Sequence, residues 1–522
     1  MSFLMIRLCL SCCCLFFGNI ATVMGHSQPV VKTTIDHENL KKNLNLHEKS
    51  YSELVNYYKE LTEVLRSTRR NILSIVLNGE KEESLNISSI GPFPIRGNFL
   101  PALPKDTSIL DVGCATGDNL ALMDEAGFNN TTGIDIASGM IQEAKIHQKF
   151  NLLHGDILQF SPEKPYDLVY AQAFIHLFPK NTLETVLLKL ISLSNRRIYF
   201  STTIHDSPNE GLEQKEEENV YRYRSRYTLS EILTVLRKIL DDNPQLSVHY
   251  FFLKDPLGKY WINCIIEKND VKKMFEEDGI LIYKQFFAPE KITKVLPEID
   301  ALATTIPKPN TIMRYDTETV FDRIENFIPY CSNELRQIAS SPKIINTVSL
   351  LLNEEVVLFK DKINFKMPGS GAFVPHQDAA AGWDEYGDVH HSVAISFDAS
   401  NEENGALYFA PGAHKQGLLS PLKKPLSPEV IAKLNWKIIS TEPGDTLFFG
   451  SYIPHYSNAN NSNRTRRMAF LTYMPSRCGD HREAFFQEKR KRQPSIDERE
   501  STDGLVRDEF GKLIFKTKEG SS

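Results

Sequence analysis

The sequence has 522 residues, which is too long for one domain of typical size, so two or three domains are expected. Its hydrophobic fraction of 41% and its charged fraction of 24% are those of an ordinary globular protein. The net charge of -6 argues against nucleic acid and against a stable membrane partner, and it leaves the oligomeric state open.

Residues 1–28 form either a signal peptide or an apolar tail. A largely apolar run over residues 8–24 follows a basic residue, which is typical of a secretory signal and too short for a transmembrane helix with these flanks. A mis-assigned start codon would give the same pattern. Sequons at Asn129, Asn130 and Asn463 argue against a eukaryotic secretory route, because glycans there would obstruct the two motifs described below.

The cysteines give a second indication of the compartment. Four of the eight lie within the first fourteen residues, and the others are widely scattered. This is neither a disulfide framework nor a zinc-binding spacing. Isolated, reduced thiols favour a cytoplasmic protein, while the signal-like segment leaves export open.

Residues 34–268 are predicted to form one α/β domain with helices at its start. Apolar residues at helical spacing predict one or two helices over residues 34–80. Predicted strands and helices then alternate, which indicates a Rossmann-like parallel sheet with helices on both faces. The predicted strands are 108–112, 132–136, 167–171, 197–202, 247–252 and 260–267, and the predicted helices between them are 119–126 and 138–147.

The pattern changes at residues 268–270, where a second domain is predicted to begin. A helix is expected over residues 271–278. Short alternating segments separated by Pro, Gly and Asn turns then predict an all-β jelly roll, a double-stranded β-helix, over residues 271–500. Residues 501–522 are expected to form a C-terminal tail. The expected strands are 280–283, 356–359, 392–397, 405–410, 446–449 and 468–474.

An apolar segment runs into a glycine-rich turn at residues 109–117, with the sequence I-L-D-V-G-C-A-T-G. Gly113 and Gly117 let the backbone approach a ligand closely and adopt positive φ. Asp135 ends the next predicted strand, where an acidic residue can bind both hydroxyls of a ribose. Asp156 follows a third predicted strand. These residues predict a nucleotide-type cofactor site.

On these motifs, residues from about 45 to 268 resemble a class I S-adenosylmethionine-dependent methyltransferase. Ala115 stands where many members have glycine. A dinucleotide-binding Rossmann protein is the competing interpretation, but the loop lacks the G-x-G-x-x-G order. A methyltransferase fold without activity also stays open. The resemblance implies S-adenosylmethionine as cofactor. The candidate residues that contact it, along its length from the methionine portion to the adenine, are Asp111, Gly113, Gly117, Asp135 and Asp156.

The second motif begins with His376-Gln377-Asp378. Residues i and i+2 of a strand point to the same face, so this imidazole and this carboxylate aim at a common point. His455, 77 positions after Asp378, completes a 2-His-1-carboxylate triad, the site type that leaves open positions on non-haem Fe(II). Arg466 lies eleven residues further on and can supply a guanidinium for a carboxylate ligand.

Residues from about 271 to 500 resemble the phytanoyl-CoA dioxygenase family of Fe(II)/2-oxoglutarate oxygenases. Besides the triad, the matching segments are F-E-E-D-G at 275–279, K-M-P-G-S-G at 366–371, N-G-A-L at 404–407, P-G-A-H at 411–414 and P-G-D at 443–445. The resemblance implies that iron is bound by His376, Asp378 and His455.

The resemblance also assigns the 2-oxoglutarate contacts. It implies that Arg466 binds the far carboxylate of 2-oxoglutarate, assisted by Ser457. Arg464 and Arg467 are rivals of Arg466. Strand alternation places Arg464 on the same face as Arg466 and Arg467 on the opposite face.

Asp378 also bears on the reaction type. Halogenating relatives have a small residue in place of this carboxylate, so its presence predicts hydroxylation or a related oxidation with O2. Trp383 and Tyr386, just beyond the triad motif, are candidate substrate contacts.

The sequence therefore predicts a bifunctional enzyme that methylates and hydroxylates a small-molecule metabolite. One alternative is a 2-oxoglutarate dioxygenase whose methyltransferase fold serves only as a sensor or recruitment domain. A modifier of proteins or nucleic acids is a third hypothesis, against which stands the absence of a visible basic groove or peptide-binding module.

Overall fold

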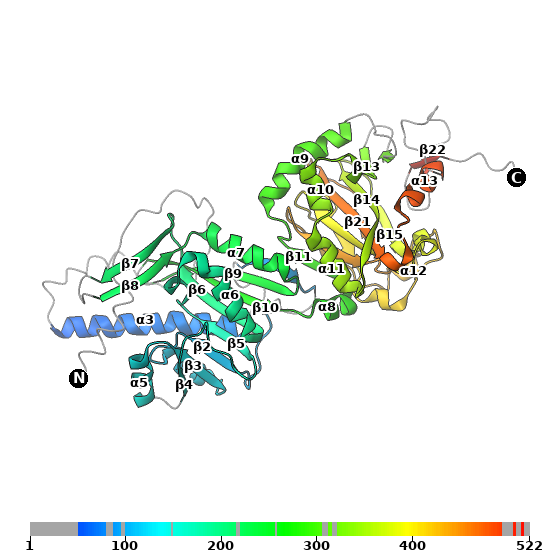
Figure 1. Ribbon diagram of the computed structural model, residues 1–522. Coiled ribbons are helices and arrows are strands. Elements are labelled where there is room, and N and C mark those ends of the chain that lie inside the picture. Colours follow the sequence, from blue (N-terminus) through cyan, green and yellow to red (C-terminus); the bar gives the residue numbers. More distant parts are fainter. Residues whose placement is uncertain are drawn as a thin grey trace. The chain divides into compact units, whose positions relative to one another are not determined.

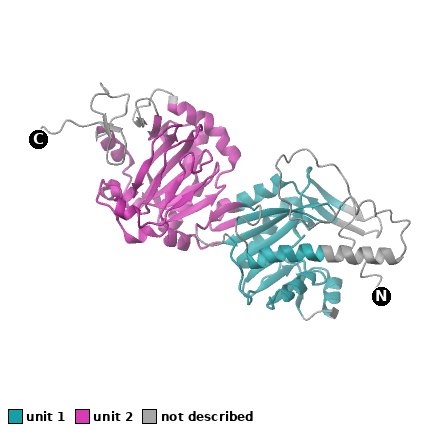
Figure 2. Ribbon diagram, turned by 180° about the vertical axis from the view of Figure 1, so that it is seen from behind, with its two compact units in different colours: residues 1–88, 98–239, 248–268 teal, residues 89–97, 240–247, 269–522 magenta. Residues whose placement is uncertain are grey.

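The computed structural model describes residues 51–79, 87–95, 100–147, 150–215, 220–255, 258–304, 312–315, 321–492, 505–507 and 513–515. The chain divides into two compact units, shown in Figure 2. Unit 1 comprises residues 1–88, 98–239 and 248–268, and unit 2 comprises residues 89–97, 240–247 and 269–522. The signal-like residues 1–28 and most of the tail 501–522 lie outside the described residues, and the predicted domain boundaries stay predictions.

Unit 1 is built on a mostly parallel sheet with the strand order β4-β3-β2-β5-β6-β10-β9 (Figure 1). Neighbouring strands from β4 to β6 are parallel, and β10 is antiparallel to β6. The central strand β2 is buried along its whole length, as expected for a strand covered on both faces. The strands are β2 (Ile109–Val112), β3 (Thr131–Asp135), β4 (Asn151–His154), β5 (Tyr166–Ala171), β6 (Ser194–Thr203), β9 (Leu246–Lys254) and β10 (Tyr260–Lys268).

The helices predicted over residues 119–126 and 138–147 are present as α4 and α5, whereas α6 and α7 were not predicted. In α6, buried Leu183, Val186, Leu187, Leu190 and Ile191 repeat at the spacing of one helix face. Strands β7 (Asn209–Lys215) and β8 (Val220–Arg226) form a separate hairpin. The main helices are α3 (Tyr51–Asn78), α4 (Asp118–Glu125), α5 (Ser138–His147), α6 (Leu183–Ser192) and α7 (Leu229–Asp242).

Unit 2 is built around two main antiparallel sheets, and its architecture confirms the predicted double-stranded β-helix. The larger sheet has the order β12-β13-β14-β21-β16-β19-β11-β1, and the smaller has the order β15-β20-β17-β18. The strands of the larger sheet are β1 (Ser88–Phe93), β11 (Ile280–Lys284), β12 (Ile312–Tyr315), β13 (Phe321–Glu325), β14 (Val356–Lys366), β16 (His391–Ser396), β19 (Thr446–Gly450) and β21 (Arg466–Pro475). Those of the smaller are β15 (Phe373–His376), β17 (Leu407–Phe409), β18 (Lys437–Ile439) and β20 (His455–Ser457).

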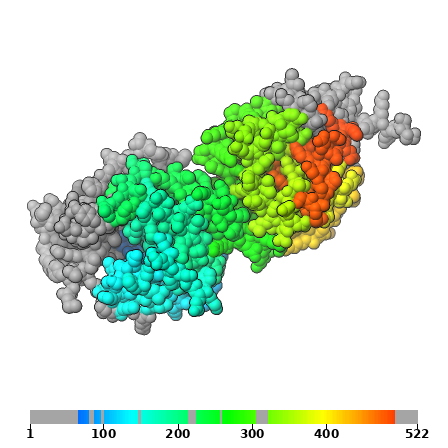
Figure 3. All heavy atoms as spheres, in the orientation of Figure 1, coloured from blue at the N-terminus to red at the C-terminus, as the bar shows by residue number. Residues whose placement is uncertain are grey.

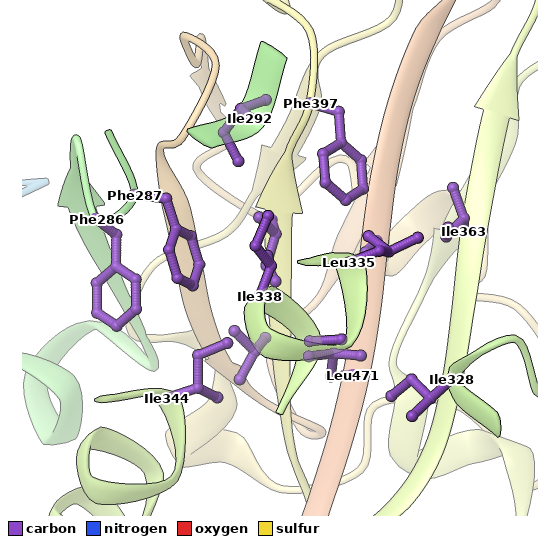
Figure 4. Packing of buried hydrophobic residues seen from close by; sticks show 14 of the residues in the cluster. Phe286, Phe287, Ile292, Ile328, Leu335, Ile338, Ile344, Ile363, Phe397 and Leu471 are labelled. Atoms are coloured by element: carbon purple, nitrogen blue, oxygen red, sulfur yellow. The ribbon is translucent and has the colours of Figure 1, made fainter. Parts of the chain in front are cut away.

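Helices cover the outer face of the larger sheet. Alternating residues of each strand face either these helices or the space between the sheets: Leu281 of β11 packs in the first layer and Ile282 in the second. Figure 4 shows Leu335 and Ile338 of α10 beside Leu471 of β21 in the helix-facing layer. The helices of unit 2 are α8 (Val271–Asp278), α9 (Pro289–Thr304), α10 (Asn333–Ala339), α11 (Pro342–Leu352), α12 (Pro428–Ile431) and α13 (Arg482–Arg492).

Helix α13 packs on β14, where the rings of Phe485 and Phe359 lie 4.7 Å apart. In Figure 3 it forms part of the orange-red surface of unit 2. Short strands β22 (Leu505–Arg507) and β23 (Leu513–Phe515) pair beyond it. Among the described helices, none has a stretch long and apolar enough to cross a membrane.

Candidate metal and cofactor sites

Three ligand-bearing side chains meet where the smaller sheet of unit 2 ends. His376 closes β15 and lies opposite His455, which opens β20. Asp378 starts the short helix η4 (Asp378–Ala381), so its carboxylate turns back toward the two imidazoles. One ligand atom from each residue lies within 4.8 Å of the others, and His376 Nε2 is 3.9 Å from Asp378 Oδ1. The set can occupy one face of an octahedral ion and leave the opposite positions open.

Backbone contacts orient both imidazoles. Nδ1 of His376 lies 2.7 Å from the carbonyl oxygen of Val374, and Nδ1 of His455 lies 3.1 Å from that of Ile453. Donation from Nδ1–H to these carbonyls leaves Nε2 as the free ligand atom. Burial lowers the pKa of His376 to about 3 and also lowers the pKa of His455, so both rings are neutral at pH 7.

The carboxylate of the triad is ionised. Burial by itself raises the pKa of Asp378, but His455, Lys360 and His376 together lower it to about 2. Ser392 also donates to Asp378 Oδ2 across 3.4 Å. Two neutral imidazoles and one carboxylate are the donor set that suits Fe(II), so the described residues fit that metal.

Gln377, between the two ligands, anchors the turn. Its buried amide donates to Gly417 O (2.8 Å) and Tyr452 O (2.6 Å), and its oxygen accepts from Leu419 N (2.6 Å). Gln377 follows the end of β15 and still has extended backbone angles, so its side chain points to the side opposite that of His376. It therefore positions His376 and Asp378 without touching a ligand.

Replacing Gln377 with alanine is expected to lower the free energy of unfolding by about 2–3 kcal/mol, because buried backbone groups lose their partners. The Fe(II) affinity should fall by about tenfold to a hundredfold, since the turn that carries two ligands loosens. Urea unfolding and anaerobic Fe(II) titration measure the two effects. Exposed Gln487 offers a matched control. Unchanged metal affinity in a destabilised Gln377→Ala variant would mean that this glutamine supports the fold alone.

Arg466 provides a cation in the same pocket. Its guanidinium is buried, Nη2 donates to Gly405 O (3.0 Å), and Nε has no hydrogen-bond partner among the described residues. No described carboxylate forms an ion pair with it, and burial lowers its pKa to about 10. Ser457, lining the same pocket, accepts from Lys366 across 2.8 Å. This end of the pocket therefore fits the far carboxylate of 2-oxoglutarate.

The two rivals of Arg466 lie elsewhere. Arg464 is exposed. Arg467 lies on the other face of β21, where it forms ion pairs with Asp398 and Asp300, each at 2.7 Å. Only Arg466 of the three lines the pocket.

The pocket holds about 510 Å³ of empty space, a volume that includes open solvent. Besides the expected residues, it is lined by polar side chains that sequence reasoning missed: Lys360, Lys362, Asn364, Ser392 and Thr472. The signal that could have found them is the alternation K-x-K-x-N on one strand. Trp383 and Tyr386 do not line it: Trp383 packs under Lys360, and Tyr386 donates to Glu488 (2.9 Å).

In unit 1, the other motif residues gather at the carboxyl ends of the parallel strands. The chain reverses its winding direction between β2 and β5, which makes this edge the expected ligand site. Gly113 and Gly117 have φ of 70° and 84°, which glycine adopts without strain. Asp135 accepts from Ala115 N (3.0 Å) and Ala137 N (2.8 Å), so it holds the loop after β2 against the end of β3.

The remaining acids of this edge differ in their surroundings. Asp156 accepts from Leu158 N (2.9 Å) just after β4. Asp111 is fully buried, and neither of its carboxylate oxygens has a hydrogen-bond partner among the described residues. Burial outweighs the opposing effect of Asn119 and raises the pKa of Asp111 to about 7. A buried orphan carboxylate beside a glycine loop fits a ligand with a cationic end.

Ile136 is a residue of this edge that sequence reasoning missed. It follows Asp135 directly, and 69% of its surface is exposed although it is a large apolar residue. An exposed apolar side chain next to Asp135 offers a surface on which a flat ring can pack. An apolar residue directly after the strand-ending acid was the available signal.

Comparisons with known proteins agree with this division. The phytanoyl-CoA dioxygenase (PhyH) family model matches residues 275–468, and a methyltransferase domain model matches residues 109–195. A 2-aminoethylphosphonate dioxygenase from the uncultured bacterium HF130_AEPn_1 is 37% identical over 44% of this chain and 89% of its own length. A methylphosphonate hydroxylase from Gimesia maris is 38% identical over 31% of this chain and 62% of its own length.

The N-terminal half has its own relative. A trans-aconitate 2-methyltransferase from Enterobacter sp. (strain 638) is 29% identical over 21% of this chain. The matched segment covers 43% of the length of that enzyme. The chain thus carries two enzyme domains, one of each type. Through its C-terminal unit it belongs to the phytanoyl-CoA dioxygenase family of Fe(II)/2-oxoglutarate oxygenases, joined in one polypeptide to a methyltransferase domain.

Proposed function

We propose that the chain is a bifunctional tailoring enzyme that hydroxylates and methylates one small-molecule metabolite. The observation that carries the proposal is the juxtaposition, in one pocket, of the triad His376, Asp378 and His455 with buried Arg466, which has no ion pair among the described residues. Fusion supports a shared substrate, because it places two modifying steps at high effective concentration.

In the oxygenase reaction, Fe(II) supplies O2 activation and 2-oxoglutarate supplies two electrons as it loses CO2. One oxygen atom enters succinate, and the other replaces a C–H bond of the substrate with C–OH, which supplies the remaining two electrons. His376, Asp378 and His455 would hold the metal, and Arg466 with Ser457 would orient 2-oxoglutarate. The two relatives named for phosphonates support a small phosphonate as the candidate substrate.

For the methyltransferase domain we propose S-adenosylmethionine as the methyl donor. The loop of Gly113 and Gly117 would surround its methionine portion, Asp135 would bind the ribose, and Asp156 would contact the adenine. Asp111 would face the cationic end of the cofactor, which would supply a counter-charge to a carboxylate that has no ion pair among the described residues.

Replacing Asp111 with asparagine is expected to stabilise the cofactor-free protein while weakening S-adenosylmethionine binding. Because the pKa of Asp111 is raised, the free energy of unfolding falls as the pH rises from about 4 to about 7. The total loss is about 4 kcal/mol, since the buried carboxyl ionises over this range. The variant should therefore match the wild type in unfolding free energy at pH 4 and exceed it at pH 8. Its S-adenosylmethionine affinity should fall by roughly tenfold to a hundredfold.

Calorimetric titration with S-adenosylmethionine and urea unfolding at the two pH values test the Asp111 prediction. Exposed Asp124 supplies a matched aspartate control in the same domain. Loss of stability at both pH values with unchanged cofactor affinity would contradict it, because Asp111 would then be a structural residue.

The proposed function is tested by mass spectrometry of a metabolite extract incubated with the full chain, Fe(II), 2-oxoglutarate, ascorbate, S-adenosylmethionine and ¹⁸O-labelled O2. One compound should gain both a labelled oxygen and a methylene. Omission of 2-oxoglutarate should remove only the oxygen, and Asp135→Ala should remove only the methylene.

Other outcomes would change the assignment. Oxygen gain without any methyl gain, unaffected by Asp135→Ala, would point to a dioxygenase with a non-catalytic methyltransferase fold. Two unrelated compounds, each gaining one group, would refute the shared substrate. Modification of a peptide or oligonucleotide pool in place of a metabolite would refute the small-molecule class.

A further inference from the structure

Two lysines of β14 face the iron pocket at alternate positions. Lys360, Lys362 and Asn364 all line the pocket, whereas Asp361 and Ile363 between them are buried on the opposite side of the strand. A bulge between Leu358 and Lys360 sets this alternation. The row therefore turns two ammonium groups toward the space beside the triad.

Lys360 and Lys362, the lysine row, lie at the other end of the pocket from Arg466. On the paired strands β14 and β21, Arg466 is opposite Lys366, while Lys362 is opposite Phe470 and Lys360 is opposite Thr472. Six residues of strand separate the level of Lys366 from that of Lys360, about 20 Å along the backbone. The carboxylate end of 2-oxoglutarate at Arg466 is thus remote from Lys360. The lysines are therefore placed to bind a different group.

Hydroxyl groups complete the lysine end. Ser392 of β16 is opposite Thr472 of β21, and their hydroxyls lie 3.0 Å apart. Lys360, Thr472 and Ser392 thus lie side by side across three neighbouring strands. Because Ser392 also donates to Asp378, this end of the pocket adjoins the triad directly.

The described carboxylates near the two lysines offset their charge only in part. Lys360 Nζ lies 3.4 Å from the ring centre of Trp383, and Lys362 Nζ lies 4.9 Å from that of Phe470. Neither ammonium forms an ion pair with a carboxylate of the described residues, whereas the nearby cations Arg323 and Lys489 are both paired with Glu325. Burial lowers the pKa of both pocket lysines, and the nearby carboxylates Asp378 and Glu325 offset only part of that effect.

Charge counting indicates what the pocket accepts. Fe(II) and dianionic 2-oxoglutarate cancel each other, and the single carboxylate Asp378 offsets only part of the charge of Arg466, Lys360 and Lys362. A net positive charge then remains in a partly dehydrated pocket, where aromatic rings hold the two lysines in place. A compact dianion satisfies such a pair, whereas a neutral substrate leaves it unpaired at a cost in free energy.

We propose that Lys360 and Lys362, with the hydroxyls of Ser392 and Thr472, bind the phosphonate group of the oxygenase substrate and thereby present its neighbouring C–H bond to the metal. The inference rests on the proposed function, because it assigns the substrate end of the same pocket. A tetrahedral group with three oxygens can accept from two ammonium groups and from hydroxyls at the same time.

The test uses the full chain, with 2-aminoethylphosphonate and methylphosphonate as probes, and compares wild type with Lys360→Met and Lys362→Met. Succinate formation should show KM for the phosphonate raised at least about tenfold, and up to about a hundredfold, in each variant. Lys360→Arg should restore part of the loss. Lys437→Met, at an exposed lysine on β18, should match the wild type.

A second measurement separates the two proposals. When 2-oxoglutarate chelates Fe(II), a visible charge-transfer absorption forms anaerobically, and its titration gives the 2-oxoglutarate affinity. Both Met variants should retain that affinity within about twofold. If they lose it, the lysines serve 2-oxoglutarate and the inference is wrong. If the wild type itself forms no complex, the proposed oxygenase function fails first.

A matched substrate series tests the anion class. 2-Aminoethylphosphonate, taurine and β-alanine share one aminoethyl skeleton and carry a phosphonate, a sulfonate and a carboxylate. Only the phosphonate should be turned over efficiently, and the preference should shrink in both Met variants. Equal turnover of all three would overturn the inference. So would a wild-type complex with Fe(II) and 2-oxoglutarate that neither oxidises nor is inhibited by any phosphonate.

Discussion

Replacing Asp378 with alanine is expected to lower the Fe(II) affinity at least about a hundredfold and to abolish 2-oxoglutarate-dependent turnover. Even the loss of a residue that only hydrogen-bonds to a metal ligand can lower metal affinity by up to about a hundredfold, and Asp378 would be a ligand itself. Asp378 is the only anion of the triad, and both histidines are neutral. Without it the ion would meet two neutral ligands and the positive charges of Lys360 and Lys362. Anaerobic Fe(II) titration and succinate formation measure the effect.

The Asp378→Ala variant carries its own internal control. Methyl transfer should continue at the wild-type rate, because the methyltransferase domain lies in the other compact unit. Exposed Asp384, six residues further along the chain, gives a matched Asp→Ala substitution that should leave iron binding unchanged. An Asp378→Ala protein that retained Fe(II) affinity within threefold would rule out this carboxylate as a metal ligand.

The second large effect is expected at Arg466. Replacement by methionine should weaken 2-oxoglutarate binding by about 3 kcal/mol, roughly 150-fold, because a buried charge pair with the cosubstrate is lost. Fe(II) binding should persist, since Arg466 touches no ligand of the triad. Titration of the Fe(II) charge-transfer absorption with 2-oxoglutarate gives the affinity.

Arg466→Met should also stabilise the cosubstrate-free protein. The guanidinium is buried without an ion pair among the described residues, and burial lowers its pKa to about 10, so its charge opposes folding when 2-oxoglutarate is absent. Arg466→Lys keeps the charge but not the planar fork, and it should lie between wild type and methionine in affinity. A variant that is destabilised and binds 2-oxoglutarate normally would contradict the assignment.

Several elements were predictable because their signals are local. Helix α8 begins after Asp270, whose side chain accepts from Lys273 N (3.0 Å), and it ends at Gly279 with φ of 77°. Both are capping features that sequence alone displays. Similarly, the glycine turn after β2 and the acid that ends β3 are neighbours in the parallel sheet. The spacing of these two motifs along the chain therefore predicts the edge of the sheet where they meet.

Strand β14 shows where local signals fail. The prediction covered residues 356–359, but the strand continues to Lys366. Its second half alternates polar and buried residues, with lysines on the pocket face, so apolar periodicity gives a strand signal only for the first part. Strands β15 and β20 are too short for any periodicity, although they carry both histidines of the triad.

By itself, the sequence determined the two fold classes, the triad candidates and the glycine-rich cofactor loop, because each depends on residues close together in the chain or on a distinctive residue type. Tertiary structure alone showed what holds Arg467 away from the pocket, since Asp398 and Asp300 bind it from 69 and 167 positions away. It alone also revealed the lysine end. Whether an ammonium group has a partner depends on how strands β14, β16 and β21 pair. No local sequence pattern predicts that pairing.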